Sequence, residues 1–196
     1  MKTQRILNIS KFIFVLGLLV TFSSLAYAAE TYKLDPAHTS IVFRVKHLGV
    51  TYVYGRINGP TGSFVFDESS PSKCAIEIQA ETKNVDTAVE KRDTDLKSPD
   101  FFNAGEHPYV SFKSKSVKNL SEKTYEVSGD LTLLGKTLPV TTEVHATGSG
   151  KDPWGGFRMG FETSFSIKRS DFGMDFMMGG VSDEVNLTVS VEGIRQ

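Results

Sequence analysis

Alternation of apolar and polar residues constrains the fold of this chain more than any other feature. From Phe157 to Ile167 every second residue is apolar or nearly so, and the residues between them are polar or glycine. A period of two over this length is typical of a β-strand with one wet face and one dry face. The same period recurs in residues 40–47, 63–66, 73–82, 109–118, 124–133, 138–146 and 181–192. The sequence therefore predicts about eight strands, most of them joined by short turns.

Residues 86–97 interrupt this pattern. They lack the two-residue period, contain few β-branched residues and begin with Asp86, a residue type that caps helix N-termini. This predicts a helix that ends at Ser98-Pro99. A short turn should follow and place Phe101 or Phe102 against the sheet. The pattern as a whole predicts one antiparallel all-β domain with a mid-chain helical insertion, closed as a barrel or packed as a sandwich.

The N-terminal 28 residues are predicted to be a secretory signal peptide. Residues 1–11 carry three basic residues and no acid, residues 12–22 are almost entirely apolar, and Ala26-Tyr27-Ala28 supplies the small residues of a cleavage site. The apolar run is shorter than the roughly 20 residues that a membrane span needs, so no stable membrane anchor is expected. The mature domain should comprise residues 29–196.

Charge and cysteine content exclude several classes of protein. Removing the three basic residues of the signal leaves 19 Lys and Arg against 23 Asp and Glu, a formal charge of −4, with no basic cluster in the sequence. Nucleic acid is therefore not an expected partner, and an anionic membrane surface is disfavoured. Cys74 is the only cysteine, so no intramolecular disulfide can form, and we expect it to be a small buried residue.

No catalytic, metal-binding or cofactor motif stands out. The four histidines show no H-x-H or H-E-x-x-H spacing, and zinc needs three or four converging ligands. There is no G-x-S-x-G nucleophile elbow either. His47 shares the dry face of Phe43 and Val45, so we expect a buried imidazole or a polar contact to a ligand. The sequence predicts no catalytic residue, no metal and no cofactor.

The dry face mixes bulky and small residues, which leaves two interpretations open. Phenylalanines alternate there with glycine, alanine, serine and threonine, so the interior is either well packed or partly vacant. Trp154, between a proline and two glycines, is predicted to seal one end of the sheet. The Met- and Phe-rich loop 171–180 is apolar for a connection, which favours a flexible lip over a cavity or a dimer contact.

Several blocks of sequence, in order, resemble the YceI-like family of secreted proteins: Tyr32–His38, Phe43–Gly49, Gly62–Asp67, Arg92-Asp93, Leu96–Phe102, Gly129–Gly135 and Asp152–Gly156. The resemblance covers nearly all of the mature chain. It implies an extended eight-stranded antiparallel lipocalin-like barrel with a helix over one end. It also implies a periplasmic protein, often a homodimer, that holds a polyisoprenoid or another lipid-like chain. Asp95 stands where the family often has histidine, a difference that changes the charge and the hydrogen bonding offered to a ligand's head group.

From alternation and resemblance together we predict a periplasmic protein that binds a long apolar ligand, such as a polyisoprenoid, a quinone or a fatty chain, inside the barrel. An enzyme acting on such a ligand and an interaction protein with a filled core are the alternatives. The predicted ligand-binding residues line the barrel, its mouth or the lip: Phe43, Phe112, Phe161, Phe165, His38, His47, Arg92, Asp93, Phe102 and Phe172.

Overall fold

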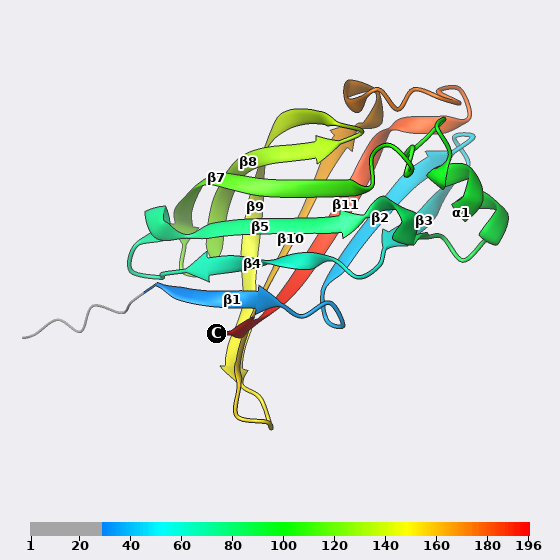
Figure 1. The fold of residues 1–196 in the computed structure, drawn as a ribbon. Helices are drawn as coiled ribbons and strands as arrows, with labels where there is room; N and C mark the ends of the chain where they lie inside the picture. The colour runs from blue at the N-terminus through cyan, green and yellow to red at the C-terminus, as the bar shows by residue number, and fades with distance from the viewer. Residues whose placement is uncertain (1–28) are drawn as a thin grey trace, which may run out of the picture.

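Antiparallel strands make up most of residues 29–196, the part of the chain that the computed structural model describes (Figure 1). The predicted signal peptide lies outside the described residues. One α-helix, α1 (Glu90–Lys97), interrupts the series of strands. The strands are β1 (Glu30–Leu34), β2 (Ser40–His47), β3 (Thr51–Ile57), β4 (Thr61–Phe66), β5 (Ala75–Glu81), β6 (Val85–Asp86), β7 (Tyr109–Ser121), β8 (Thr124–Leu133), β9 (Lys136–Lys151), β10 (Phe157–Lys168) and β11 (Val181–Arg195).

Eight of these strands close into a barrel in the order β1-β4-β5-β7-β8-β9-β10-β11, because β1 pairs with both β4 and β11. The predicted lipocalin-like barrel is thus confirmed. The long strand β11 pairs with β1 only near its C-terminal end, at residues 193–195, and with β2 along residues 181–190. The remaining strands, β2, β3 and β6, therefore extend the barrel wall toward the end where α1 lies (Figure 1).

The dry faces of the strands point inward, as the alternation predicts. In β8 every second residue, from Tyr125 to Leu133, is buried, and the residues between them are not. β2 and β8 begin and end at the predicted residues. Strands β1, β3 and β6 were not predicted. β1 and β6 are short, and β3 carries bulky residues on both faces, so its alternation of apolar and polar residues is weak.

The helix begins later than predicted. Asp86 belongs to β6 and pairs with Arg56 of β3, so it does not cap the helix. Ala88 then takes a left-handed conformation with φ 61°, which turns the chain before Glu90, and the cap residue is Val89. The predicted end at Ser98 is confirmed. None of the helices within residues 29–196 is long and apolar enough to cross a membrane.

Aromatic side chains fill the end of the barrel opposite α1. Tyr32 stacks on Phe64, with ring centroids 4.8 Å apart, and Phe161 meets the edge of Phe64 at 5.4 Å. Phe66 contacts both Phe161 and Tyr125. Edge-to-face and offset contacts of this kind stabilise beyond the area that they bury. Four members of this aromatic cluster also line the cavity described below: Phe64, Phe66, Tyr125 and Phe161.

Trp154 takes no part in that cluster. It lies in the turn between β9 and β10, which projects from the body of the molecule (Figure 1), and its side chain is 81% exposed. The prediction that this ring seals an end of the sheet is wrong. The turn is held by Asp152, whose carboxylate accepts hydrogen bonds from the backbone of Trp154 and Gly156, so the tight corner does not require the ring.

Candidate ligand-binding cavity

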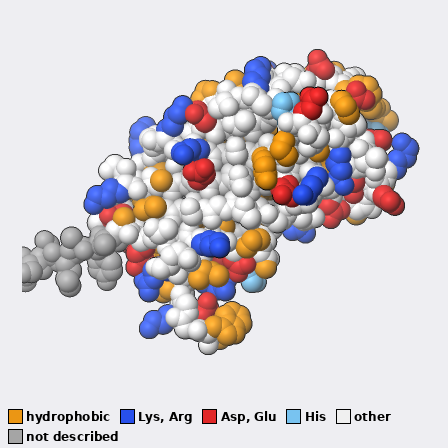
Figure 2. All heavy atoms as spheres, in the orientation of Figure 1, with side chains coloured by type: hydrophobic (Ala, Val, Ile, Leu, Met, Phe, Trp, Pro, Cys, Tyr) orange, Lys and Arg blue, Asp and Glu red, His pale blue; other side chains and the backbone are white. Residues whose placement is uncertain are grey.

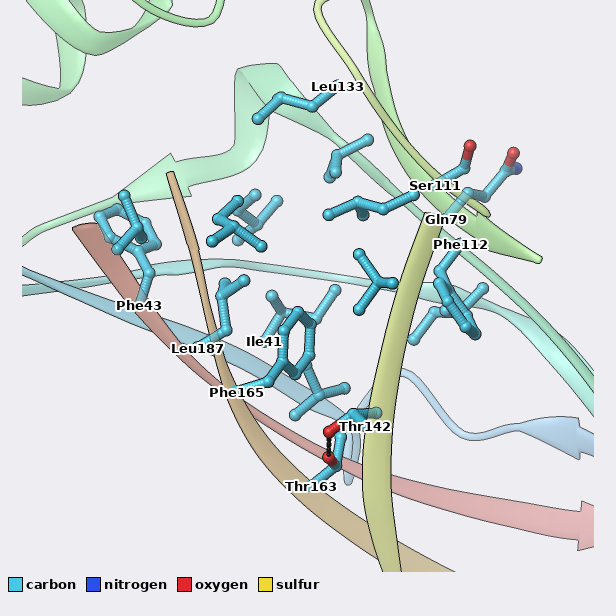
Figure 3. A pocket seen from close by; sticks show the side chains of 18 of the residues that line it. Ile41, Phe43, Gln79, Ser111, Phe112, Leu133, Thr142, Thr163, Phe165 and Leu187 are labelled. Atoms are coloured by element: carbon cyan, nitrogen blue, oxygen red, sulfur yellow. Dashed lines mark hydrogen bonds between the residues drawn. The ribbon is translucent and has the colours of Figure 1, made fainter. Parts of the chain in front are cut away.

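A cavity of about 740 Å³ occupies the barrel lumen. Its wall is made mainly of aliphatic and aromatic side chains from the inward faces of the strands, and Figure 3 shows Ile41, Phe43, Phe165 and Leu187 converging on it. The volume lies within the range of about 300–1,000 Å³ typical of small-molecule sites. Of the two interpretations of the barrel interior, the structure therefore shows the partly vacant one, not the filled core.

Seven of the ten predicted ligand-binding residues line this cavity: Phe43, Phe112, Phe161, Phe165, His47, Arg92 and Phe102. The imidazole of His47 is exposed, because His47 is the last residue of β2 and lies next to a turn. The prediction of a buried imidazole is wrong. The other three, His38, Asp93 and Phe172, lie outside the lining. Whether any of the ten contacts a ligand remains a prediction.

Glycines let the large phenylalanine rings lie flat against the wall. Gly55 is the cross-strand partner of Phe43, and a Cβ atom there would overlap the Phe43 ring. Phe112 covers Gly129 in the same way. Because glycine has no side chain, each ring packs directly against the backbone of the neighbouring strand. The ring therefore lies along the barrel wall and leaves the centre of the lumen open.

Two threonines place a polar spot on the apolar wall. Thr142 of β9 and Thr163 of β10 both face the lumen, and their hydroxyls lie 2.7 Å apart (Figure 3). Thr163 donates to the backbone carbonyl of Glu143 at 2.7 Å. Thr142 can then donate to Thr163, so both protons are used within the wall. The two hydroxyls therefore satisfy each other and the wall, and they add little polarity to the lining.

Helix α1 and the turn after it form one side of the cavity mouth. Arg92 donates to the hydroxyl of Thr87 at 2.7 Å and to its carbonyl at 2.8 Å, and Asp93 accepts from the same hydroxyl and from the Thr87 backbone. These contacts fix the helix against the chain that precedes it. Arg92 and Asp95 reach the cavity lining, whereas Asp93 is engaged with Thr87 and does not.

The loop 171–180 forms the other side of the mouth and is called the lip below. Met174, Phe176 and Met177 line the cavity from it, and Phe176 meets the ring of Phe101 at 5.5 Å. The predicted position of this loop over a lumen is thus confirmed for these side chains. Phe172 instead packs in the core beneath the lip, because it ends a short 3₁₀ turn that faces inward.

Arg169, which sequence reasoning missed, holds the lip in place. Its side chain is only 2% exposed, and its guanidinium donates to the backbone carbonyls of Met174, Phe176, Val181 and Ser182 at 2.8–3.0 Å. Burial lowers the pKa of this guanidinium, and Asp183 and Asp175 partly offset the effect. Nothing in the sequence distinguishes Arg169 from an exposed loop arginine.

His38 lies in an ionic cluster remote from the lining. Its Nδ1 is 2.8 Å from Asp35, and Asp35, His38 and Glu192 are near enough to one another to share a metal ion. However, Arg158 donates to Asp35 at 2.8 Å and also to Glu192 and Asp152, so a guanidinium occupies the carboxylates. Arg158 first, and then His38, lower the pKa of Asp35 from 3.8 to about 2.

Cys74 lines the cavity and is half-buried. Its sulfur accepts a hydrogen bond from the backbone N–H of Asp67 at 3.2 Å. Burial raises the pKa of the thiol. A raised pKa disfavours the thiolate, which is the nucleophilic form, so this geometry fits a packing residue better than a reactive one.

A family model described as a YceI-like domain matches residues 32–193. The chain belongs to this family. A UPF0312 protein of Pseudomonas paraeruginosa is 46% identical over 170 residues, which cover 86% of this chain and 88% of that protein. BcnA of Burkholderia cenocepacia superposes with a TM-score of 0.74 at 21% identity, covering 81% of this chain and 98% of BcnA.

A more distant structure is a polyisoprenoid binding domain from Saccharophagus degradans implicated in plant cell wall breakdown. It has a TM-score of 0.67 and 13% identity, and the match covers 84% of this chain and 98% of that domain. At this level of identity the likeness shows that the two chains share a fold.

Proposed function

We propose that this YceI-like protein binds one long apolar chain, of the polyisoprenoid, quinone or fatty type, in its barrel lumen. The observation that carries the proposal is the cavity of about 740 Å³ with a predominantly apolar wall. The polyisoprenoid binding domain of Saccharophagus degradans, which has the same fold, supports it.

The size of the cavity suits a chain better than a compact ligand. At about 30 Å³ per methylene-sized group, the volume that a water occupies in the liquid, the lumen has room for about 25 groups. Enclosing a CH₂ group contributes about 0.8 kcal/mol, so a full lumen would contribute about 20 kcal/mol before association costs of about 4–15 kcal/mol. The remainder of about 5–16 kcal/mol spans the value of about 8 kcal/mol that micromolar binding requires.

Polar selectivity would reside at the mouth. Arg92 and Asp95 from α1 and His47 from β2 lie where a chain would leave the lumen, so they are the groups that a ligand's head would meet. We place the protein in the periplasm, on the strength of the predicted signal peptide. An enzyme that acts on the same ligand is the alternative, and recovery of an altered ligand would distinguish it.

The test is organic extraction of the purified protein, followed by mass spectrometry of the extract. The wild type should release a long-chain compound. Phe165→Glu places a carboxylate in the lumen and should abolish retention, because an isolated charge cannot be solvated there. Ser164→Glu adds the same charge at the neighbouring, outward-facing position of β10 and should retain the ligand.

Folding of both variants is checked by far-UV circular dichroism. Phe165→Leu, which keeps the wall apolar, should still retain the ligand and shows that position 165 tolerates substitution. Equal ligand recovery from the two glutamate variants would refute the proposal, as would a wild type that releases no apolar compound and takes up none from solution.

A further inference from the structure

Five exposed apolar side chains surround one side of the cavity mouth. They come from the turn between β2 and β3 and from the lip, and we call them the apolar rim: Leu48, Val50, Phe176, Met177 and Met178. Leu48 is 62% exposed and Val50 is 82% exposed. Figure 2 shows apolar side chains at the end of the molecule where the lip and this turn lie in Figure 1.

The two segments of the rim form one surface that continues into the lumen. The backbone N–H of Leu48 donates to the carbonyl of Gly180 at 2.8 Å, which ties the β2–β3 turn to the end of the lip. Phe176 and Met177 belong both to the rim and to the cavity lining. These two side chains therefore connect the exposed apolar surface with the cavity wall.

Two rim residues hold a backbone conformation that their side chains disfavour. Leu48 has φ 51° and Met177 has φ 56°, in the left-handed region where glycine and asparagine are the common residues. Leu48 and Gly49, which has φ 69°, are the two central residues of a turn closed by a hydrogen bond from the Val50 N–H to the His47 carbonyl at 2.9 Å. Asn-Gly is the common pair where both central residues of a turn have positive φ. Burial of the Leu48 side chain does not offset the cost of this backbone conformation, because most of the side chain is exposed. This favours a role for the side chain in a contact outside the protein.

Basic side chains from β2 flank the rim, although residues 29–196 as a whole carry a formal charge of −4. Residues 36–66 contain three Arg and Lys and no Asp or Glu. Arg44 and Lys46 lie over the ring of Tyr52, at 4.5 and 5.6 Å from its centroid, and Tyr52 is exposed. Tyrosine beside Lys and Arg is typical of surfaces that sit at the level of lipid head groups. Two acids also belong to this region: Asp175 in the lip, and Glu184, which is exposed on β11 and whose charge acts on Arg44.

We propose that the apolar rim docks on a phospholipid bilayer, with Arg44 and Lys46 at the level of the lipid phosphates and the cavity mouth facing the hydrocarbon. This inference rests on the proposed function, because a chain that is insoluble in water would then pass between bilayer and lumen along an apolar surface. Insertion of the rim supplies most of the binding, since the protein as a whole carries net negative charge.

Leu48→Asn is the decisive variant, because it should act in opposite directions on binding and on stability. Asparagine suits the turn, so the midpoint of thermal unfolding should stay the same or rise. Loss of an inserted leucine should weaken binding to vesicles at least about tenfold. Leu120→Asn, at an exposed position in β7, is the matched control and should bind like the wild type. Binding is measured by flotation with vesicles of phosphatidylethanolamine and phosphatidylglycerol, and with vesicles of phosphatidylcholine alone.

The proposal is supported if the wild type and Leu120→Asn float with the vesicles and Leu48→Asn floats less. A modest loss of wild-type binding at high salt would also support it. It is overturned if the wild type does not float, or if Leu48→Asn floats equally well. It is also overturned if Trp154→Ala abolishes flotation while Leu48→Asn does not, because Trp154 projects elsewhere. Dimers that dissociate in Leu48→Asn, without flotation of the wild type, would assign the rim to a second copy of the chain.

Ligand extraction from the same preparations separates this inference from the proposed function. Leu48→Asn should retain the extracted ligand, because Leu48 lies outside the cavity lining. If the wild type retains a ligand but does not float, the docking proposal fails alone. If it floats but never yields an apolar ligand, the proposed function fails and the docking surface stands.

Discussion

Replacement of Arg158 by leucine should destabilise the protein at neutral pH much more than at low pH. Arg158 joins three segments: its guanidinium donates to Asp35 after β1, to Asp152 in the β9–β10 turn and to Glu192 of β11. The side chain of Arg158 is 21% exposed, and those of Asp35 and Asp152 are less exposed still. Screening by water is therefore weaker here than for a surface ion pair.

The magnitude follows from Asp35. Its pKa is lowered from 3.8 to about 2, with Arg158 as the largest cause. One pKa unit corresponds to about 1.36 kcal/mol, so the network stabilises the ionised carboxyl by about 2.4 kcal/mol. Because the folded pKa is depressed, this stabilisation is fully present above about pH 4 and is lost as the pH falls through about 2. Arg158 supplies the largest part of this stabilisation and His38 the next, so Arg158→Leu should cost about 1–2 kcal/mol at pH 7 through Asp35.

The assay is urea unfolding followed by far-UV circular dichroism, at neutral pH and near pH 2. The difference between the wild type and Arg158→Leu should shrink toward the lower pH, and the pKa of Asp35, measured by carboxyl NMR, should rise in the variant. Lys118→Met removes an exposed ion pair with Glu126 and should cost less than about 1 kcal/mol. An Asp35 pKa that stays near 2 in Arg158→Leu would refute the reasoning.

Two further predictions concern the cavity. Gly55→Ala should push the Phe43 ring into the lumen, cost about 1–3 kcal/mol on urea unfolding and reduce the amount of ligand extracted; unchanged retention would show that the ring has room elsewhere. Arg169→Met leaves four backbone carbonyls, one of them in a fully buried hydrogen bond, without their side-chain donor. It should cost at least about 3 kcal/mol and speed amide hydrogen exchange in the lip, and unchanged exchange would contradict this role.

The fold could be predicted from the sequence because alternation records burial directly. In strands such as β8 and β10 one face meets the lumen and the other meets water, so the period of two survives along the whole strand. The phenylalanines at 43, 112, 161 and 165 were correctly placed on the lumen for the same reason. Strand β3 was missed because Tyr52 and Tyr54 are apolar side chains on its outer face, which obscures the alternation.

The residues predicted for the mouth were placed only in part, because contacts distant in the sequence decide which of them reach it. His38 lies in the turn before β2 and Arg92 lies in α1, yet only Arg92 reaches the cavity. What separates them is the position of Arg158, which lies 120 residues beyond His38 in the chain and holds the Asp35–His38 turn against β11. A contact of that sequence separation leaves no periodic signal for local reasoning to detect.

Whether the lumen is filled or vacant depends on cross-strand register, which composition does not record. The interior contains many phenylalanines, and this alone would favour a filled core. The structure instead sets Gly55 opposite Phe43 and Gly129 beneath Phe112, so each ring lies along the wall. A slip of one residue would turn these glycines to the outer face and leave the rings to stand in the lumen. The vacancy on which ligand binding depends is therefore a property of strand pairing, and it would be lost without any change in hydrophobic content.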